Sequence, residues 1–208
     1  MRTTLAGLAL LLMLGGCPGP EAKPDYFPLV PGARRWMEVH TRTITGSDTS
    51  ETTEVRLVSR VHGEQEIPEQ GKLWVIETPR DSGPAMLSYF RKSDTAVVQL
   101  VPMRDRPALE KLYLSLPLEK GKGWQDSPAR REMFEVVAQE TVTVKGGVFP
   151  DCFKVAIIST GVDWAMHEWY AAGVGSVKWE SRAAWTRDSV NYEQVRTAEL
   201  VRYELPAE

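Results

Sequence analysis

Histidine is a common metal ligand in proteins, and it occurs three times in this sequence. His40, His62 and His167 share no spacing typical of metal ligands. The stretch HEWYA at 167–171 begins like a zinc-protease motif but lacks the second histidine of that motif. We therefore expect His167 to lie on a sheet face, and we predict neither a metal site nor a cofactor.

The possible nucleophiles and carboxylates form no catalytic pattern either. Ser176 stands in GVGSV, which is not the Gly-x-Ser-x-Gly pattern of a nucleophile elbow, so we interpret it as a turn-to-strand residue. Carboxylates such as Asp163, Glu168 and Glu180 cannot be paired across a cleft from sequence, and we expect each on a solvated face. The sequence thus predicts a non-catalytic protein, with an enzyme such as a hydrolase as the less favoured alternative.

Cys17 follows a short apolar segment at the N-terminus. Arg2 precedes the uncharged run 5–14, which spans ~15 Å against the ~30 Å core of a bilayer and is too short to cross it. A basic residue, a short apolar run and small residues before a cleavage site are typical of a secretory signal peptide. At its end, Leu14-Gly15-Gly16-Cys17 resembles the lipobox of bacterial lipoproteins.

The lipobox resemblance implies cleavage after Gly16 and a diacylglyceryl group on the Cys17 sulfur, usually with a third acyl chain on the new amino terminus. Each buried CH₂ contributes ~0.8 kcal/mol, so several chains anchor a protein stably. In such proteins an aspartate after the cysteine favours the inner membrane, and Pro18 stands there instead. We therefore predict a lipid-anchored protein of the bacterial envelope, at the outer membrane and facing the periplasm. The alternative is an ordinary signal peptide cut elsewhere, with Cys17 incidental.

The chain divides into a signal peptide over 1–16, a lipidated cysteine with a proline-rich tether over 17–24, and a single β-rich domain over 25–208. The net charge of −3 is spread without long runs, which argues against a nucleic-acid partner. If Cys17 is acylated, Cys152 has no cysteine partner within the chain. We predict a buried structural thiol at Cys152, with a reactive cysteine as the alternative.

Most of the chain alternates apolar and polar residues with a period of two. In TEVRLVSRVH, at 53–62, Val55, Leu57 and Val61 share one face, as in a half-buried strand. About ten such runs, separated by Gly, Pro, Asp and Ser, favour a mainly β, antiparallel sheet curved into a sandwich or barrel. Besides 53–62 they lie at 35–44, 72–79, 85–92, 95–102, 132–144, 151–160, 164–171, 175–185 and 191–205.

Two segments of the sequence are compatible with a helix. Leu109, Leu112, Tyr113 and Leu116 fall at i, i+3, i+4 and i+7, which predicts one short helix near 106–115. The stretch 191–205 contains no breaker and could be a helix by composition, but we predict a strand there.

The seven tryptophans need no ligand if they cover the core and the corners of the sheet. The alternative is that Trp74, Trp164 and Trp179 line a concave hollow able to hold an acyl chain or a sugar. Alternation places Trp164 and Trp169 on opposite faces of their strand, so at most one of that pair can face such a hollow.

Three blocks carry a family likeness: DYFPLVPGARRW (25–36), ETVTVKGGVFPDCFKV (140–155) and EWYAAGVGSVKWE (168–180). They resemble recurring blocks of uncharacterised bacterial envelope lipoproteins, which are grouped under domain-of-unknown-function headings and often called TapB-like. The resemblance implies an antiparallel, incomplete β-barrel, loosely similar to the carriers LolA and LolB, in which a curved sheet wraps an apolar hollow closed by a helix. It implies no activity.

Together these features predict a lipid-anchored envelope protein that binds an apolar small molecule or a lipid in a half-barrel hollow. A structural or assembly accessory that binds another envelope protein is the alternative. The two differ in structure, because a ligand carrier needs a continuous apolar cavity and an accessory needs an exposed surface over a filled interior.

Overall fold

The computed structural model describes residues 23–80, 82–103, 106–127 and 130–206. The predicted signal peptide over 1–16, Cys17 and most of the tether over 17–24 lie outside these ranges. Within them, no helix is long and apolar enough to cross a membrane. The chain forms the strands β1 (Arg34–Thr45), β2 (Asp48–Ile67), β3 (Gly71–Thr78), β4 (Met86–Lys92), β5 (Ala96–Met103), β6 (Arg106–Ser115), β7 (Gly123–Ser127), β8 (Arg130–Val144), β9 (Gly147–Ser159), β10 (Asp163–Ala171), β11 (Gly175–Arg187) and β12 (Val190–Glu204).

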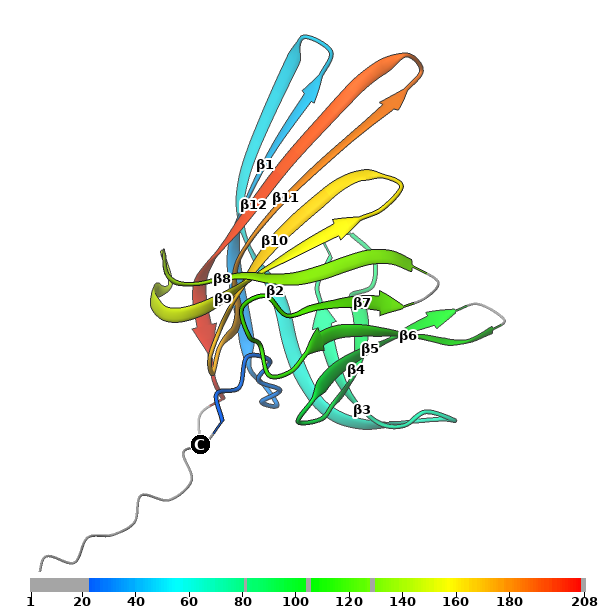
Figure 1. Ribbon diagram of the computed structural model, residues 1–208, viewed down its shortest axis with the longest axis vertical. Coiled ribbons are helices and arrows are strands. Elements are labelled where there is room, and N and C mark those ends of the chain that lie inside the picture. Colours follow the sequence, from blue (N-terminus) through cyan, green and yellow to red (C-terminus); the bar gives the residue numbers. More distant parts are fainter. Residues whose placement is uncertain (1–22, 81, 104–105, 128–129, 207–208) are drawn as a thin grey trace, which may run out of the picture.

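The strand order joins two meanders into one antiparallel sheet of 12 strands. Strands β1 to β6 pair in chain order, and so do β7 to β12 (Figure 1). The two meanders meet where β1 pairs with β12, from Arg34 opposite Glu204 to Thr45 opposite Tyr192. Strands β6 and β7 are therefore the two edges of the sheet.

The sheet curls until its two edges approach each other. Lys111 on β6 forms ion pairs with Asp126 on β7, at 3.8 Å, and with Glu132 on β8. We call this contact the seam. Side chains connect the two edges of the sheet there, whereas β6 and β7 are not paired as neighbouring strands. The nearly closed barrel confirms the predicted antiparallel curved sheet.

The predicted helix near 106–115 is wrong, because this segment is strand β6. The register of β5 and β6 shifts between the pairs Val97–Leu114 and Val98–Leu112, which leaves Tyr113 in a β-bulge. The bulge places Leu112, Tyr113 and Leu114 all against the core, and this produces apolar spacings that resemble a helical period. The predicted strand at 191–205 is confirmed as β12.

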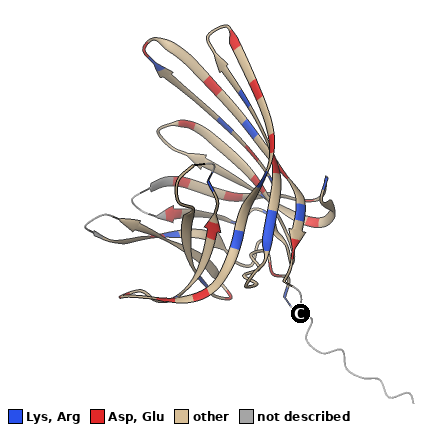
Figure 2. Cartoon of the chain, turned by 180° about the vertical axis from the view of Figure 1, so that it is seen from behind, with Lys and Arg blue, Asp and Glu red and all other residues tan. Residues whose placement is uncertain are grey.

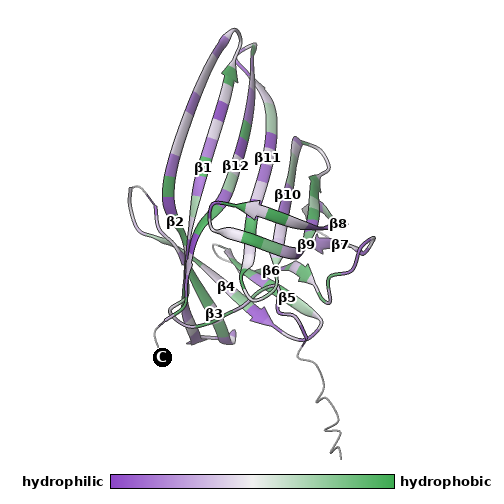
Figure 3. Cartoon of the chain, turned by 90° about the vertical axis from the view of Figure 1, so that its left-hand side faces the viewer, coloured by the Kyte–Doolittle hydropathy of each residue, from purple (hydrophilic) through white to green (hydrophobic). Residues whose placement is uncertain are grey.

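The β1–β2 and β11–β12 hairpins project beyond the barrel, and their tips point away from the N-terminal segment (Figure 1). Figure 2 shows basic and acidic residues interspersed along them, and Figure 3 shows hydrophilic and hydrophobic residues alternating. Cross-strand ion pairs such as Arg42–Glu51, at 3.5 Å, and Arg182–Glu193, at 3.0 Å, fit a sheet that water reaches. We refer to these two as the projecting hairpins.

Aromatic and aliphatic side chains fill most of the barrel. The N-terminal segment 25–30 enters this core, and Tyr26, Phe27 and Leu29 are each at most 8% exposed. The Phe27 ring lies 5.1 Å from the Phe90 ring and 5.5 Å from the Tyr113 ring, at tilted angles that aromatic pairs favour. We call the end of the barrel that this segment covers the closed end.

A second core cluster forms where the β8–β9 hairpin folds over β12. Its turn approaches so closely that Gly146 N–H donates to the Leu200 carbonyl, at 2.7 Å. Cys152 lies in this cluster, fully buried, and its burial raises the pKa of the thiol to about 11. The predicted burial of Cys152 is confirmed, and the raised pKa favours the protonated thiol, as expected of a structural cysteine.

Candidate functional site

A cavity of about 210 Å³ lies inside the barrel, against the N-terminal segment and the interior faces of both meanders. We call it the central cavity. Its lining mixes aromatic rings with groups that form hydrogen bonds, which distinguishes it from the apolar core around it. The lining residues are Phe27, Arg35, Met37, Val58, Ser59, Ile76, Thr78, Ser88, Phe90, Gln99, Tyr113, Glu168, Tyr170, Ser176 and Trp179.

Glu168 supplies a buried carboxyl to this cavity. Alternation along β10 places it on the interior face with Tyr170, and it is 6% exposed. The Tyr170 hydroxyl donates to Glu168 Oε2, at 2.6 Å. Burial raises the pKa of the Glu168 carboxyl, while the neighbouring Ser176, Tyr170 and Arg35 oppose that rise. The prediction of a solvated Glu168 is therefore wrong.

Arg35 supplies the positive charge. Its Nε donates to Ser59 Oγ, at 2.9 Å, and its Nη1 lies 3.4 Å from the Val174 carbonyl oxygen. Gly175 leaves room for the guanidinium, because a Cβ at that position would lie 2.6 Å from Nη1. Ser59 on β2 and Val174 in the β10–β11 turn thus hold the guanidinium in place, and its charge lowers the pKa of the nearby Glu168 carboxyl.

Two tyrosine hydroxyls complete the polar lining. Tyr113, in the bulge of β6, interacts with Tyr170, and burial raises the pKa of both phenols. Both therefore remain neutral and can donate or accept hydrogen bonds. Together with Glu168 and Arg35, they form a compact set of hydrogen-bonding groups beside the Phe27 and Phe90 rings.

The structure separates the three tryptophans predicted to line one hollow. Trp179 lines the central cavity, Trp74 lines a different hollow at the closed end, and Trp164 packs against the main core. Trp169 lies in the second core cluster, apart from Trp164. The three therefore line no common cavity, and contact of any of them with a ligand stays a prediction.

The other predicted positions lie as follows. His167 is on β10 beside Trp169, with ring centroids 6.2 Å apart, and burial lowers the pKa of its imidazole. Ser176 follows the first residue of β11, at the predicted turn-to-strand junction, and also lines the central cavity. Within the described ranges, no group of three or more His, Cys, Asp or Glu side chains is placed to hold a metal ion.

Comparison with known proteins gives no family. No family model and no curated protein sequence matches the chain. Among solved structures, it is similar to one described as an exported protein with a YmcC-like fold from Bacteroides fragilis, at 19% identity over 87% of this chain and 99% of the other, with a TM-score of 0.45. It is also similar to one described as a lipoprotein from Parabacteroides distasonis, at 13% identity over 88% and 100%, with a TM-score of 0.48. Both TM-scores are below 0.5. The resemblance to TapB-like proteins, LolA and LolB stays a prediction.

Proposed function

We propose that this protein is a lipid-anchored component of the bacterial envelope that binds a small, hydroxyl-rich ligand in the central cavity and catalyses no reaction. The proposed location at the membrane is the one that the lipobox-like sequence around Cys17 predicts. The ligand differs from the predicted apolar one, because polar groups converge where an acyl chain would need an apolar wall.

The observation that carries this proposal is the convergence of hydrogen-bonding groups beside aromatic rings in one cavity. Arg35 and the Glu168 carboxyl line the same space, and the positive charge of Arg35 acts on that carboxyl. Burial raises the pKa of the Glu168 carboxyl, which accepts hydrogen bonds in either protonation state and also donates one when it is protonated. Ligand hydroxyls can then accept from Arg35 and exchange hydrogen bonds with Glu168, while the Phe27 ring packs against the apolar face of a sugar.

The size of the cavity supports a small ligand. At about 210 Å³ it is smaller than the ~300–1,000 Å³ of sites for drug-sized molecules, so one sugar unit suits it better than a chain of several.

Binding fits this lining better than hydrolysis. Enzymes that hydrolyse glycosidic bonds use two carboxyl groups that flank the bond. Among the described residues that line the cavity, Glu168 is the sole carboxylate.

Tyr113→Phe tests the proposal, because it removes one hydroxyl and keeps the ring that packs on Phe27 and Phe90. The probes are glucose, glucosamine and glucuronic acid. Ligand-observed NMR measures the binding of each to the full-length protein. We expect binding of at least one probe, weakened about tenfold by the variant. Tyr192→Phe, on a projecting hairpin, is the matched control and should leave binding unchanged. Absence of binding for all three probes would argue against the proposal.

A second candidate is the accessory role, which one feature of β2 favours. Among the described strands, β3 pairs with β2 only from Arg60 to Ile67, so residues 48–59 present an outer edge without a paired strand. Such an edge can bind an extended segment of another protein. Glu51 and Glu54 lie along it, and charged side chains are a common device against unspecific edge pairing.

A further inference from the structure

A hollow of about 520 Å³ lies at the closed end of the barrel, larger than the one beside Trp74 and separate from the central cavity. We call it the closed-end hollow. The N-terminal segment, the β4–β5 turn and the chain after β6 form its walls. It is lined by Lys23, Pro24, Asp25, Tyr26, Lys92, Ser93, Asp94, Leu116, Pro117, Leu118 and Phe153.

The floor of this hollow is apolar. Tyr26, Leu118 and Phe153 are each at most 8% exposed, and the Tyr26 and Phe153 rings meet edge to face, 5.1 Å apart. Leu116 packs against the same core from the chain after β6. The hollow falls within the ~300–1,000 Å³ range of ligand sites. Its floor therefore suits a hydrocarbon chain, unlike the central cavity.

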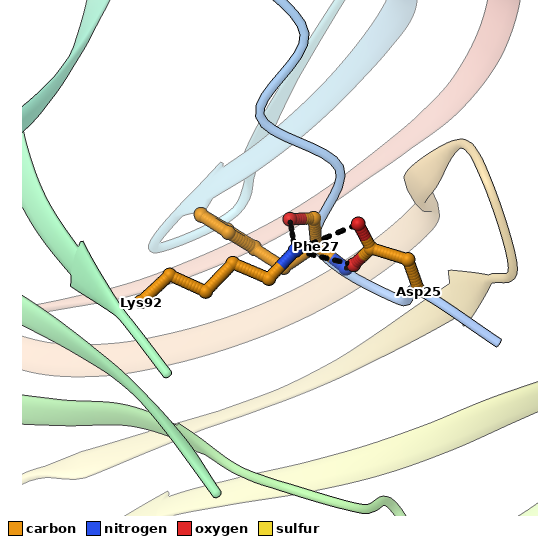
Figure 4. A network of polar contacts seen from close by, with 3 residues as sticks. All are labelled: Asp25, Phe27 and Lys92. Atoms are coloured by element: carbon orange, nitrogen blue, oxygen red, sulfur yellow. Dashed lines mark hydrogen bonds and ion pairs between the residues drawn. The ribbon is translucent and has the colours of Figure 1, made fainter. Parts of the chain in front are cut away.

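Lysines surround the mouth of the hollow. Lys92 Nζ donates to both carboxylate oxygens of Asp25, each at 2.7 Å, and to the Phe27 carbonyl, at 2.9 Å, so its charge is used to hold the N-terminal segment (Figure 4). Lys122 Nζ lies beside the hollow, where it donates to the Pro117 carbonyl at 2.9 Å. Lys23 also lines the hollow and is exposed, and Asp94 is the acidic group of the lining besides Asp25. Lys23 and Lys122 are thus placed to attract an anionic group.

The hollow also lies next to the predicted anchor. Lys23 follows Cys17 by six residues, which span at most ~22 Å when fully extended. If the Cys17 sulfur is acylated, the closed end must stay close to the membrane surface. This step rests on the lipid anchor of the proposed function, but it is independent of what the central cavity binds.

We propose that the closed-end hollow binds one acyl chain of an anionic phospholipid from the bilayer, with the phosphate near Lys23 and Lys122. The chain occupies the floor formed by Tyr26, Leu118 and Phe153. The protein thereby sits on the membrane with its closed end down, and the projecting hairpins point away from the bilayer.

Photo-crosslinking in lipid nanodiscs tests this proposal on the full-length, lipidated protein. The bilayer carries phosphatidylglycerol with a photoreactive group in its acyl chain, and mass spectrometry of peptides locates the crosslinks. We expect crosslinks in residues 24–26, 116–118 and 153, and fewer of them when phosphatidylcholine carries the group. Crosslinks that avoid these segments, or equal labelling by the two lipids, would overturn the proposal.

Charge reversal provides the second arm. Lys23→Glu with Lys122→Glu should reduce labelling of the hollow by phosphatidylglycerol at least about fivefold, because each lysine near an anionic surface contributes favourably. Arg187→Glu, at the tip of a projecting hairpin, should leave the labelling unchanged. Unchanged labelling in the double variant would also overturn the proposal.

The protein's own anchor is the competing occupant. Photoreactive fatty acid incorporated at Cys17 would then crosslink within the same molecule to residues 116–118, and that result would contradict a bilayer phospholipid. Sugar binding by the central cavity is measured separately, so failure of either proposal leaves the other distinguishable.

Discussion

Glu168 shows how one buried residue can determine the character of a cavity. A carboxyl group out of contact with water is unfavourable unless hydrogen bonds compensate it. Tyr170 provides such a bond, and Arg35 provides a nearby positive charge. Because burial outweighs these two contributions, the pKa of Glu168 lies above its usual value, and pH should act on the stability of the protein through this group.

Glu168→Gln should make stability less dependent on pH. The pKa of Glu168 is near 4.5 when unfolded and higher when folded, so the folded state retains the proton longer. Stability from this group is complete below pH 4.5 and decreases as the pH rises through the folded-state pKa. We therefore expect the variant to gain free energy of unfolding relative to the wild type across that interval, in urea titrations at several pH values. A difference between the two proteins that is constant with pH would contradict this.

Sequence alternation could predict the faces of β10 but not the environment of Arg35. Trp164 and Trp169 lie on opposite faces, as the period of two indicates. The same period places Glu168 with Tyr170, so its interior position was available from sequence, but solvation was the general expectation for a carboxylate. Arg35 contacts Ser59 and Val174, the latter 139 residues away in the sequence, and no local pattern indicates such contacts.

At the scale of elements, bulges explain where the periodicity analysis fails. One inserted residue in β6 changes the face of every residue after it, so apolar positions no longer alternate. The tight approach of the β8–β9 turn to β12 is a second feature without a periodic signal. It depends on Gly146, because a Cβ there would lie 2.9 Å from the Leu200 carbonyl oxygen.

Gly146→Ala should destabilise the protein by ~1–3 kcal/mol, because the backbone of the turn must move away from β12. Thermal or urea unfolding measures this change. Val148→Ala is the matched control, since Val148 belongs to the same hairpin and is 64% exposed, and it should change stability by less than about 0.5 kcal/mol. Equal stability of Gly146→Ala and wild type would show that the turn can shift freely.

At the scale of the whole molecule, closure of the barrel depends on the seam. The Lys111 side chain is 13% exposed, and its ammonium group forms ion pairs with the carboxylates of both Asp126 and Glu132. The barrel is not closed by strand pairing between β6 and β7, which are its edge strands. Side chains connect the two strands instead. Loss of the cation would leave two carboxylates of low exposure, at 0% and 21%, without the charge that both of them pair with.

Lys111→Met should therefore lower the free energy of unfolding by about 3 kcal/mol. Lys145→Met is the control: Lys145 pairs with Glu38, but its side chain is 60% exposed, and its loss should amount to less than about 1 kcal/mol. Urea unfolding of both variants makes the comparison. Similar losses in the two would mean that the seam is held by packing alone.

Cys17→Ser tests whether the protein is anchored to the membrane by lipid at this cysteine. The variant should lose the acyl chains, which is visible in the mass of the mature protein, and should leave the membrane fraction after cell lysis. A variant that remains in the membrane fraction with unchanged processing would show that the resemblance to a lipobox is misleading.

The pairing of β1 with β12 also sets the order in which the chain can fold. β2 follows β1 directly in the chain, but the second neighbour of β1 is β12, which comes after all the other strands of the sheet. Contacts between such distant segments form slowly, because a long loop must close before they gain any stabilisation. Until β12 is available, one side of β1 stays unpaired, and an unpaired strand edge is prone to aggregation.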